Sequence, residues 1–286
     1  IYIGRINWAM YAGVVGLVLA FRSSTNLAAA YGIAVSGSMV LETLLVITVI
    51  VGLKGAARPF FLWSVAVVGV LEALFLASNA TKILEGGWFP LLCAVLIFTL
   101  LTTWKRGTDI LTAAASSHRV PLAGFFERVS AEVPRVPGTA VFMSAAPDSV
   151  PTTLLHNLKH NKVLHERTIC LAFSTEDVPT IDDEARASVN VIEPRRLYQI
   201  TMRYGFREDP DVPRALKLLE RNGLKFDLNE TTFFLGKSTI APARRAGAFT
   251  WRRILFRWMQ RNSSGAAEYF RLPPDRVIEL GTQLKI

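Results

Sequence analysis

Four long apolar runs, separated by short polar segments, fill the first third of the chain and limit its possible folds more than any other feature. The runs cover residues 7–21, 27–53, 60–80 and 88–104. A helix needs about 20 apolar residues to cross a bilayer, and the second and third runs reach that length. Tryptophans, which settle among lipid headgroups, stand at the run ends: Trp8, Trp63, Trp88 and Trp104. The pattern predicts an α-helical membrane bundle of four helices over residues 1–106.

Charged residues are rare in this region, and their positions indicate its orientation. Residues 1–104 contain five Lys or Arg and three Glu, although the whole chain has 32 basic and 23 acidic residues. Lys54 and Arg58 separate the second and third runs, and Lys105 and Arg106 follow the fourth. Since cytoplasmic loops are enriched in Lys and Arg, we expect these two ends to lie in the cytoplasm. The charged region that follows is then cytoplasmic as well.

Two glutamates interrupt the apolar runs. The second run places small residues four apart on one helical face, Ala30, Ala34 and Ser38. Glu42 continues this face, and small residues let helices approach closely, so Glu42 is predicted to point into the bundle. Glu72 lies in the third run. Acids inside a membrane usually line an ion or proton pathway; the alternative for each is a protonated acid that makes a structural hydrogen bond.

Several segments, taken in order, carry a family resemblance. They are "SSTNLAAAYGIAVSGSMVL", "EGGWFPL", "TTWKRG", "VPGTAVFMS", "LLHNLKHNKVLHER", "ETTFFLG" and "RVIELGTQLKI". They extend over essentially the whole chain, which resembles the C-terminal part of the Kup potassium uptake proteins, the KUP/HAK/KT family. The resemblance implies a proton-coupled potassium importer with twelve membrane helices in the amino acid–polyamine–organocation arrangement, followed by a cytoplasmic domain.

On this resemblance, the chain corresponds to the last four membrane helices and the cytoplasmic domain. It opens on Ile1 rather than methionine, so we expect a piece of a longer protein whose earlier helices supply the main potassium ligands. Tyr31, beside Gly32, is a candidate neutral oxygen ligand or else an interfacial or packing tyrosine. An acid at Glu72 fits the family pattern. Glu42 departs from it, because we expect a small polar residue there in many relatives.

The C-terminal part is predicted to be a connector, residues 107–137, followed by an α/β domain, residues 138–286. Runs rich in β-branched and aromatic residues indicate strands at 138–144, 167–175, 197–206 and 230–236. Helical periodicity at 149–164 and 211–223 lies between these strands, with Gly223 as a stop signal. Such alternation favours a small sheet covered by helices.

The spacing of three histidines resembles that of a metal site, but the surrounding residues argue against one. His156 and His160 are one helical turn apart, and His165 and Glu166 follow them. Two lysines intervene, and the HExxH order of zinc enzymes is absent from the sequence. We therefore predict no metal. The sequence also has no glycine-rich nucleotide motif, and we predict no cofactor.

Residues 251–262 form a basic amphipathic segment. Its arginines, placed among aromatic and aliphatic residues, are Arg252, Arg253, Arg257 and Arg261. Helices of this kind commonly lie on anionic membrane surfaces, so we predict contact with the membrane surface or docking within the protein. A sequence pI of about 9.8 also suits nucleic acid. The adjacent bilayer offers an anionic surface closer to this segment than nucleic acid would be, and no nucleic-acid partner is expected.

The predicted function is therefore potassium import across the inner (cytoplasmic) membrane, by a multi-pass protein that is not an enzyme. The transported ions are K⁺ and protons. The expected partners are the bilayer and the earlier helices of the same protein, and a second copy pairing through the cytoplasmic domain is a further candidate. The alternative is a membrane-anchored enzyme or binding domain. A simple anchor needs one helix and no intramembrane carboxylates, so four runs with two acids favour transport.

Overall fold

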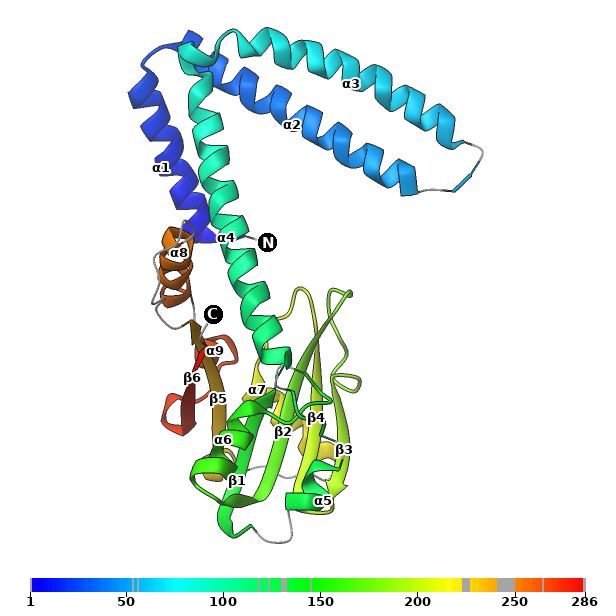
Figure 1. Cartoon of the computed structure of the whole chain (residues 1–286), viewed down its shortest axis with the longest axis vertical. Helices are drawn as coiled ribbons and strands as arrows, with labels where there is room; N and C mark the ends of the chain where they lie inside the picture. The colour runs from blue at the N-terminus through cyan, green and yellow to red at the C-terminus, as the bar shows by residue number, and fades with distance from the viewer. Residues whose placement is uncertain are drawn as a thin grey trace. The chain divides into compact units, whose positions relative to one another are not determined.

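The computed structural model describes residues 2–284 except residues 53, 56, 118, 123, 130–132, 145, 223–226, 241–249 and 264. The chain forms two compact units, Ile1–Thr102 and Thr103–Ile286. Figure 1 shows long helices in the first unit, and a sheet with shorter helices in the second. The prediction of apolar membrane-type helices followed by an α/β domain is confirmed at this level.

The first unit consists of helices, and the last of them continues beyond Thr102 into the second unit. α1 spans Gly4–Phe21, α2 Ser24–Gly52, α3 Arg58–Ala80 and α4 Trp88–Ser117, with a π-helical turn η1 at Ile83–Gly87. Four spans in this part of the chain are long and apolar enough to cross a membrane. Helices suit these runs because they satisfy every backbone polar group within the segment, as a bilayer interior requires.

The fourth helix extends beyond its predicted end at residue 104. It continues to Ser117, through the first part of the predicted connector. The segment is rich in Ala, the residue with the highest helix propensity, so the polar residues that end the membrane run do not end the helix. The remainder of the predicted connector includes a short helix, α5, at Phe125–Val129.

The second unit is built on a six-stranded sheet in the order β3-β4-β2-β1-β5-β6. Its strands are β1 Arg135–Ser144, β2 Leu164–Glu176, β3 Ala187–Glu193, β4 Leu197–Gly205, β5 Thr231–Ile240 and β6 Val277–Leu284. Neighbouring strands are parallel, except that β3 pairs antiparallel with β4 at one edge. In the centre, Val141 of β1 is the register partner of both Ile169 and Phe233. β2, β4 and β3 lie on one side of β1, and the later strands β5 and β6 lie on the other, as in doubly wound α/β folds.

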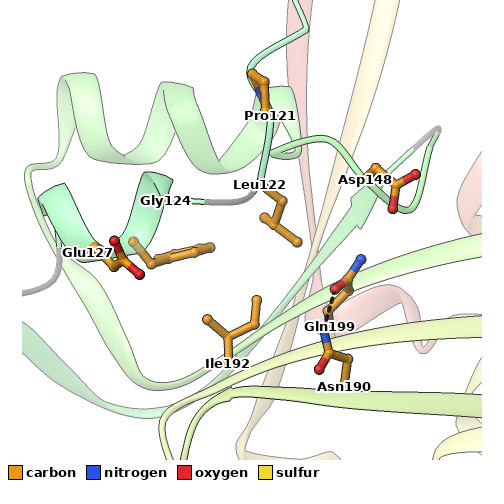
Figure 2. Close-up of a pocket in the computed structure, with 9 residues that line it drawn as sticks. Pro121, Leu122, Gly124, Glu127, Asp148, Asn190, Ile192 and Gln199 are labelled. Atoms are coloured by element: carbon orange, nitrogen blue, oxygen red, sulfur yellow. Dashed lines mark hydrogen bonds between the residues drawn. The ribbon is translucent and has the colours of Figure 1, made fainter.

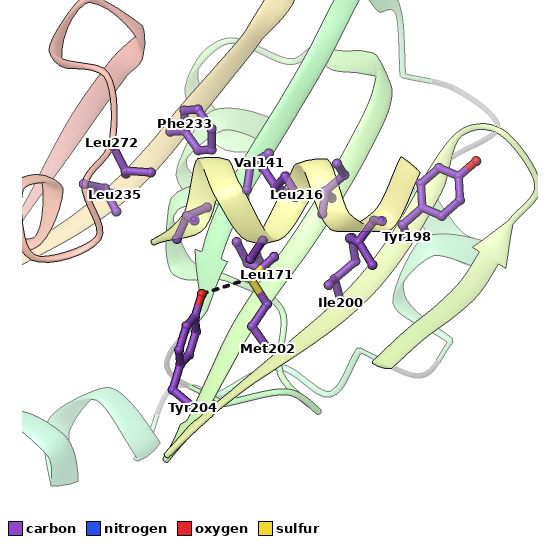
Figure 3. Close-up of a cluster of buried hydrophobic side chains, with 14 residues drawn as sticks. Val141, Leu171, Tyr198, Ile200, Met202, Tyr204, Leu216, Phe233, Leu235 and Leu272 are labelled. Carbon is purple, nitrogen blue, oxygen red and sulfur yellow. Dashed lines mark hydrogen bonds between the residues drawn. The ribbon is translucent and has the colours of Figure 1, made fainter. Parts of the chain in front are cut away.

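Apolar cores lie on both faces of this sheet. Successive side chains of a strand point to opposite faces. Val141 and Phe233 therefore join the core that contains Leu216 of α7 (Val212–Leu218), as Figure 3 shows. Their neighbours Phe142 and Phe234 stack at 4.5 Å in the other core, beneath α6 (Thr152–His160). Burial on both faces explains why these strands read as continuous apolar runs.

The strand boundaries differ from the predictions in physically understandable ways. β1 begins at Arg135 rather than at residue 138, and its register shifts between Val136 and Thr139. Gly138, with φ of 98°, occupies this bulge, a backbone conformation that favours glycine. β3 and β6 were not predicted as strands. The predicted helix stop at Gly223 lies outside the described residues.

Short elements complete the second unit. They are the 3₁₀ turns η2 Leu219–Asn222, η3 Leu228–Glu230 and η4 Pro274–Arg276, and the helices α8 Thr250–Arg261 and α9 Ala266–Tyr269. α8, drawn in orange in Figure 1, contains the basic amphipathic segment.

Candidate functional site

A buried carboxyl lies where α2 and α3 pack against each other as an antiparallel pair. Glu72 of α3 has 8% of its surface exposed. Thr43 of α2 donates a hydrogen bond of 2.6 Å from its Oγ1 to Glu72 Oε2. Gly69 faces the same threonine, because a Cβ at that position would lie 3.2 Å from Thr43 Cγ2. The missing side chain at Gly69 thus lets α2 come close enough for the hydroxyl to reach the carboxyl.

A second polar contact joins the same two helices. Asn79 Nδ2 of α3 donates to the Gly32 carbonyl oxygen at 3.2 Å and to Ser36 Oγ at 3.4 Å. Ser36 Oγ in turn donates to the Gly32 carbonyl at 2.6 Å. A Cβ on Gly32 would lie 2.9 Å from Asn79 Oδ1. Glycine is therefore required here for the asparagine to reach the backbone of α2.

The two contacts form one polar interface, which we define as Ser36, Thr43, Glu72 and Asn79. Ser36 and Thr43 are seven residues apart on α2, and Glu72 and Asn79 are seven apart on α3. Seven residues are about two helical turns, or roughly 10.5 Å along the axis. Polar groups between membrane helices are costly unless paired, and each member of this interface has a partner.

The face of α2 predicted to carry Glu42 does not make this contact. Ala30 is buried, but Ala34, Ser38 and Glu42 are exposed among the described residues. Ser38 Oγ bonds to the Val35 carbonyl of its own helix at 2.9 Å. The face of α2 that packs against α3 is therefore not the one that carries Ala34, Ser38 and Glu42; the contact of that face with another helix of the bundle stays a prediction.

Tyr31 lies on the same face as Glu42. The two residues are eleven apart, close to three full helical turns, and Tyr31 is 71% exposed. The three candidates for the ion pathway therefore divide between two faces of the hairpin. Glu72 lies in the polar interface, whereas Tyr31 and Glu42 share a face of α2 that points away from α3.

The segment "EGGWFPL" forms the turn between α3 and α4. Gly86 and Gly87 lie in η1 and are both buried. A Cβ on Gly86 would overlap the carbonyl oxygen of Asn26, and one on Gly87 would lie 2.7 Å from Ile33 Cγ1. The glycines thus allow this turn to pack tightly against α2, which fixes the entrance of α4 relative to the polar interface.

The histidines line an open cavity of about 620 Å³ beside α6. His156 and His160 stack with ring centroids 5.9 Å apart, and His156 Nε2 is 3.5 Å from Thr282 Oγ1. His165 packs edge-on against Phe234, and burial lowers the pKa of its imidazole. Among the described residues there is no group of three His, Cys, Asp or Glu side chains able to hold a metal.

A second cavity, of about 400 Å³, lies on the face of β3 and β4. Figure 2 shows Leu122 and Ile192 on its wall and Asn190 bonded to Gln199 at 3.0 Å. Gln199 also donates to the Pro147 carbonyl at 2.8 Å. The amides at this wall are thus hydrogen-bonded to each other and to the backbone.

The four arginines predicted at a membrane surface all lie on α8. Arg253 and Arg261 are exposed, and Arg252 and Arg257 are half-buried. Arg252 lies over the ring of Trp251 at 5.3 Å. Phe256 of the same helix is buried, with 2% of its surface exposed, and its ring lies 5.5 Å from that of Trp104 in α4. The helix therefore has a docked side and an exposed side.

Comparisons with known proteins cover both units. The K+ potassium transporter integral membrane domain matches residues 1–109, and the K+ potassium transporter C-terminal domain matches residues 137–286. Among curated relatives, a "Probable potassium transport system protein Kup" of Myxococcus xanthus is 47% identical over all of this chain and 44% of its own length. Similar proteins of Novosphingobium aromaticivorans and Thiobacillus denitrificans are 45% and 46% identical over all of this chain and 44% and 46% of their own lengths. The chain thus spans less than half the length of these relatives.

Proposed function

This chain belongs to the K+ potassium transporter family, and on that premise we propose that it is the C-terminal part of a proton-coupled potassium importer. The four helices would be the last four of an amino acid–polyamine–organocation type bundle in the cytoplasmic membrane. The basic residues Lys54, Arg58, Lys105 and Arg106 support a cytoplasmic position for the second unit. Transport itself belongs to the whole protein, of which this chain supplies one part.

We propose Glu72 as the coupling acid. The supporting observation is the hydrogen bond between Thr43 Oγ1 and Glu72 Oε2 at the buried contact of α2 and α3. A hydroxyl both donates and accepts hydrogen bonds. Thr43 can therefore donate to the ionised carboxylate and accept from the protonated acid. The pair stays satisfied in both states, so Glu72 can gain and lose a proton without leaving a buried polar group unpaired.

Tyr31 and Glu42 receive different roles in this proposal. The Tyr31 hydroxyl is a neutral oxygen on the face of α2 away from α3, and we propose it as a pathway-facing ligand. Glu42 shares that face but lies outside the polar interface, and we assign it no coupling role. Glu42→Gln therefore serves as a matched control for Glu72→Gln, since each removes one intramembrane carboxylate and keeps the side-chain shape.

The experiment measures potassium uptake by the full-length protein, in cells lacking other potassium importers, as a function of external pH. Glu72→Gln keeps an oxygen that accepts from Thr43, so its membrane abundance should match wild type while the acceleration of uptake at acid pH is lost. Thr43→Val should weaken the same response, and Glu42→Gln should leave it unchanged. Normal pH-dependent uptake by Glu72→Gln would refute the coupling role. Absence of potassium uptake by the correctly inserted wild-type protein would refute the transport function.

The second unit is proposed to regulate or assemble the membrane part. Its pairing with a second copy is a separate proposal with its own test. The test measures the mass of the protein in nanodiscs. The full-length protein should have the mass of two copies, and a variant that lacks residues 119–286 should have the mass of one. A single copy in both cases would refute pairing through this unit.

A further inference from the structure

The helix α8 has one apolar side chain that anchors it to the end of α4. Phe256 lies against Trp104, and its ring fills the space above Gly107, where a Cβ would overlap the ring carbons. Gly107 is itself buried. The phenylalanine thus enters a hollow that only glycine leaves open on α4. This contact holds α8 beside the segment that directly follows the fourth membrane run.

A second face of α8 exposes large apolar side chains to solvent. Trp251, Ile254 and Trp258 are 50%, 62% and 61% exposed. Their spacing of three and four residues places them in one stripe along the helix. Large apolar side chains gathered on one exposed face mark a contact surface. Since Phe256 makes the contact with α4 from another face of the helix, this stripe can bind a different surface.

Arginines flank the apolar stripe on both sides. Arg253, Arg257 and Arg261 are four residues apart and form a row along one side, and Arg252 lies on the other, over the Trp251 ring. Among the described residues, α8 contains no acidic side chain. A row of guanidinium groups beside tryptophans is complementary to an anionic, partly apolar surface such as phosphate headgroups above acyl chains.

The anchor on α4 sets the position of this surface. Trp104 ends the fourth apolar run, and Lys105 and Arg106 follow it, as expected where a helix leaves the bilayer. A helix docked at Trp104 and Gly107 therefore lies at the level of the lipid headgroups. We propose that α8 is an interfacial helix that inserts the stripe Trp251, Ile254 and Trp258 into the cytoplasmic leaflet and binds anionic lipid phosphates through its arginines.

The test places a nitroxide spin label on the stripe in the full-length protein, reconstituted in vesicles. The label is attached at Ile254→Cys, with Cys93→Ala, and with any accessible cysteine outside this chain replaced in the same way. Cys170 is buried, which raises the pKa of its thiol to about 12 and keeps it unreactive. Collision rates with oxygen, which concentrates in acyl chains, and with a water-soluble nickel chelate report the label's depth. A label at Phe206→Cys, an exposed residue that directly follows β4 in the same unit, provides the aqueous reference.

In vesicles of phosphatidylcholine with phosphatidylglycerol, we expect the Ile254 label to collide with oxygen and to be shielded from nickel. Each arginine near the surface should contribute roughly fivefold to partitioning. Removing three, as Arg253→Gln, Arg257→Gln and Arg261→Gln together, should therefore lower the ratio of inserted to aqueous label roughly 100-fold. The matched control removes three exposed charges elsewhere in the unit, Arg207→Gln, Arg214→Gln and Lys217→Gln, and should have no effect.

Three results would overturn the proposal. Equal nickel accessibility at Ile254 and Phe206 would show that the stripe lies in water. Shielding from both oxygen and nickel would show that protein, such as a second copy, covers the stripe. Insertion that is the same in pure phosphatidylcholine and is unchanged by the triple substitution would show that anionic headgroups are not recognised.

Discussion

The contact between Phe256 and Gly107 predicts that one added methyl group will loosen α8. Alanine in place of glycine within a helix normally stabilises it by about 0.5–1 kcal/mol. At Gly107, however, the new Cβ would overlap ring carbons of Phe256 and force the ring out. Phe256 is 2% exposed, and burial of such a side chain stabilises by about 1.5–3 kcal/mol. The net effect is a loss of about 1–2 kcal/mol, which raises the undocked population of α8 roughly 5- to 30-fold.

Hydrogen exchange measures this population directly. In the full-length protein, held in zwitterionic lipid so that headgroup binding does not contribute, amides of α8 should exchange roughly 5- to 30-fold faster in Gly107→Ala. Gly16→Ala in α1, where a Cβ meets nothing within 4 Å, should leave α8 unchanged. Adding Gly107→Ala to Phe256→Ala should have little further effect, because the two residues act through one contact. Wild-type exchange rates in Gly107→Ala would refute the anchor.

Three further predictions follow from the second unit and from the chain as a whole. Arg186 bonds to Glu208 at 2.8 Å, and this bond, with the backbone N–H groups of Gly205 and Ile181, holds the pKa of the Glu208 carboxyl below its ordinary 4.5. The stabilisation by the ionised Glu208 carboxylate is therefore complete above pH 4.5 and is lost as the pH falls through the lowered pKa of the folded state. Thermal melts should show Glu208→Gln less stable than wild type at pH 7, and this difference in stability should shrink in acid. A difference that grows in acid would contradict the lowered pKa. His156→Gln with His160→Gln should leave folding and metal content unchanged, whereas one zinc per chain at neutral pH that disappears in the double variant would contradict the absence of a metal site. The 286-residue chain expressed alone should insert into membranes without restoring potassium uptake, because its main ligands are expected on other helices; restored uptake would contradict that placement.

The elements with the strongest apolar patterns could be predicted from the sequence. The central strands bury side chains on both faces of the sheet, and the four long helices are apolar enough to face a bilayer, so both kinds of element consist largely of apolar residues. β3 and β6 are edge strands of the sheet and are largely exposed. Their residues, such as Glu279 and Gly281 in β6, do not alternate between apolar and polar as the residues of a typical half-buried strand do. Their strand structure comes from pairing with β4 and β5, which single-sequence patterns do not report.

The contact face of α2 could not be predicted, because it depends on the rotation of the helix. A spacing of four residues advances about 40° beyond a full turn, so a stripe beginning at the buried Ala30 rotates away from α3 by Glu42. The observed interface instead repeats every seven residues, as at Ser36 and Thr43, the repeat of helices packed at a shallow angle. The importance of Glu72 could be predicted from its charge, but its hydrogen-bond partner Thr43 could be identified only from the packing of α2 against α3.

Potassium-driven proton movement is the measurement that tests the central claim most directly. The full-length protein is reconstituted in vesicles containing a pH indicator, and an inward potassium gradient is imposed with no initial pH gradient. Wild type and Glu42→Gln should acidify the lumen as potassium enters, because in the proposed mechanism each carries protons with the ion. Glu72→Gln, at equal protein amount, should not acidify it. Lumen acidification by Glu72→Gln at the wild-type rate would show that the buried pair of Glu72 and Thr43 is structural, and that coupling lies elsewhere.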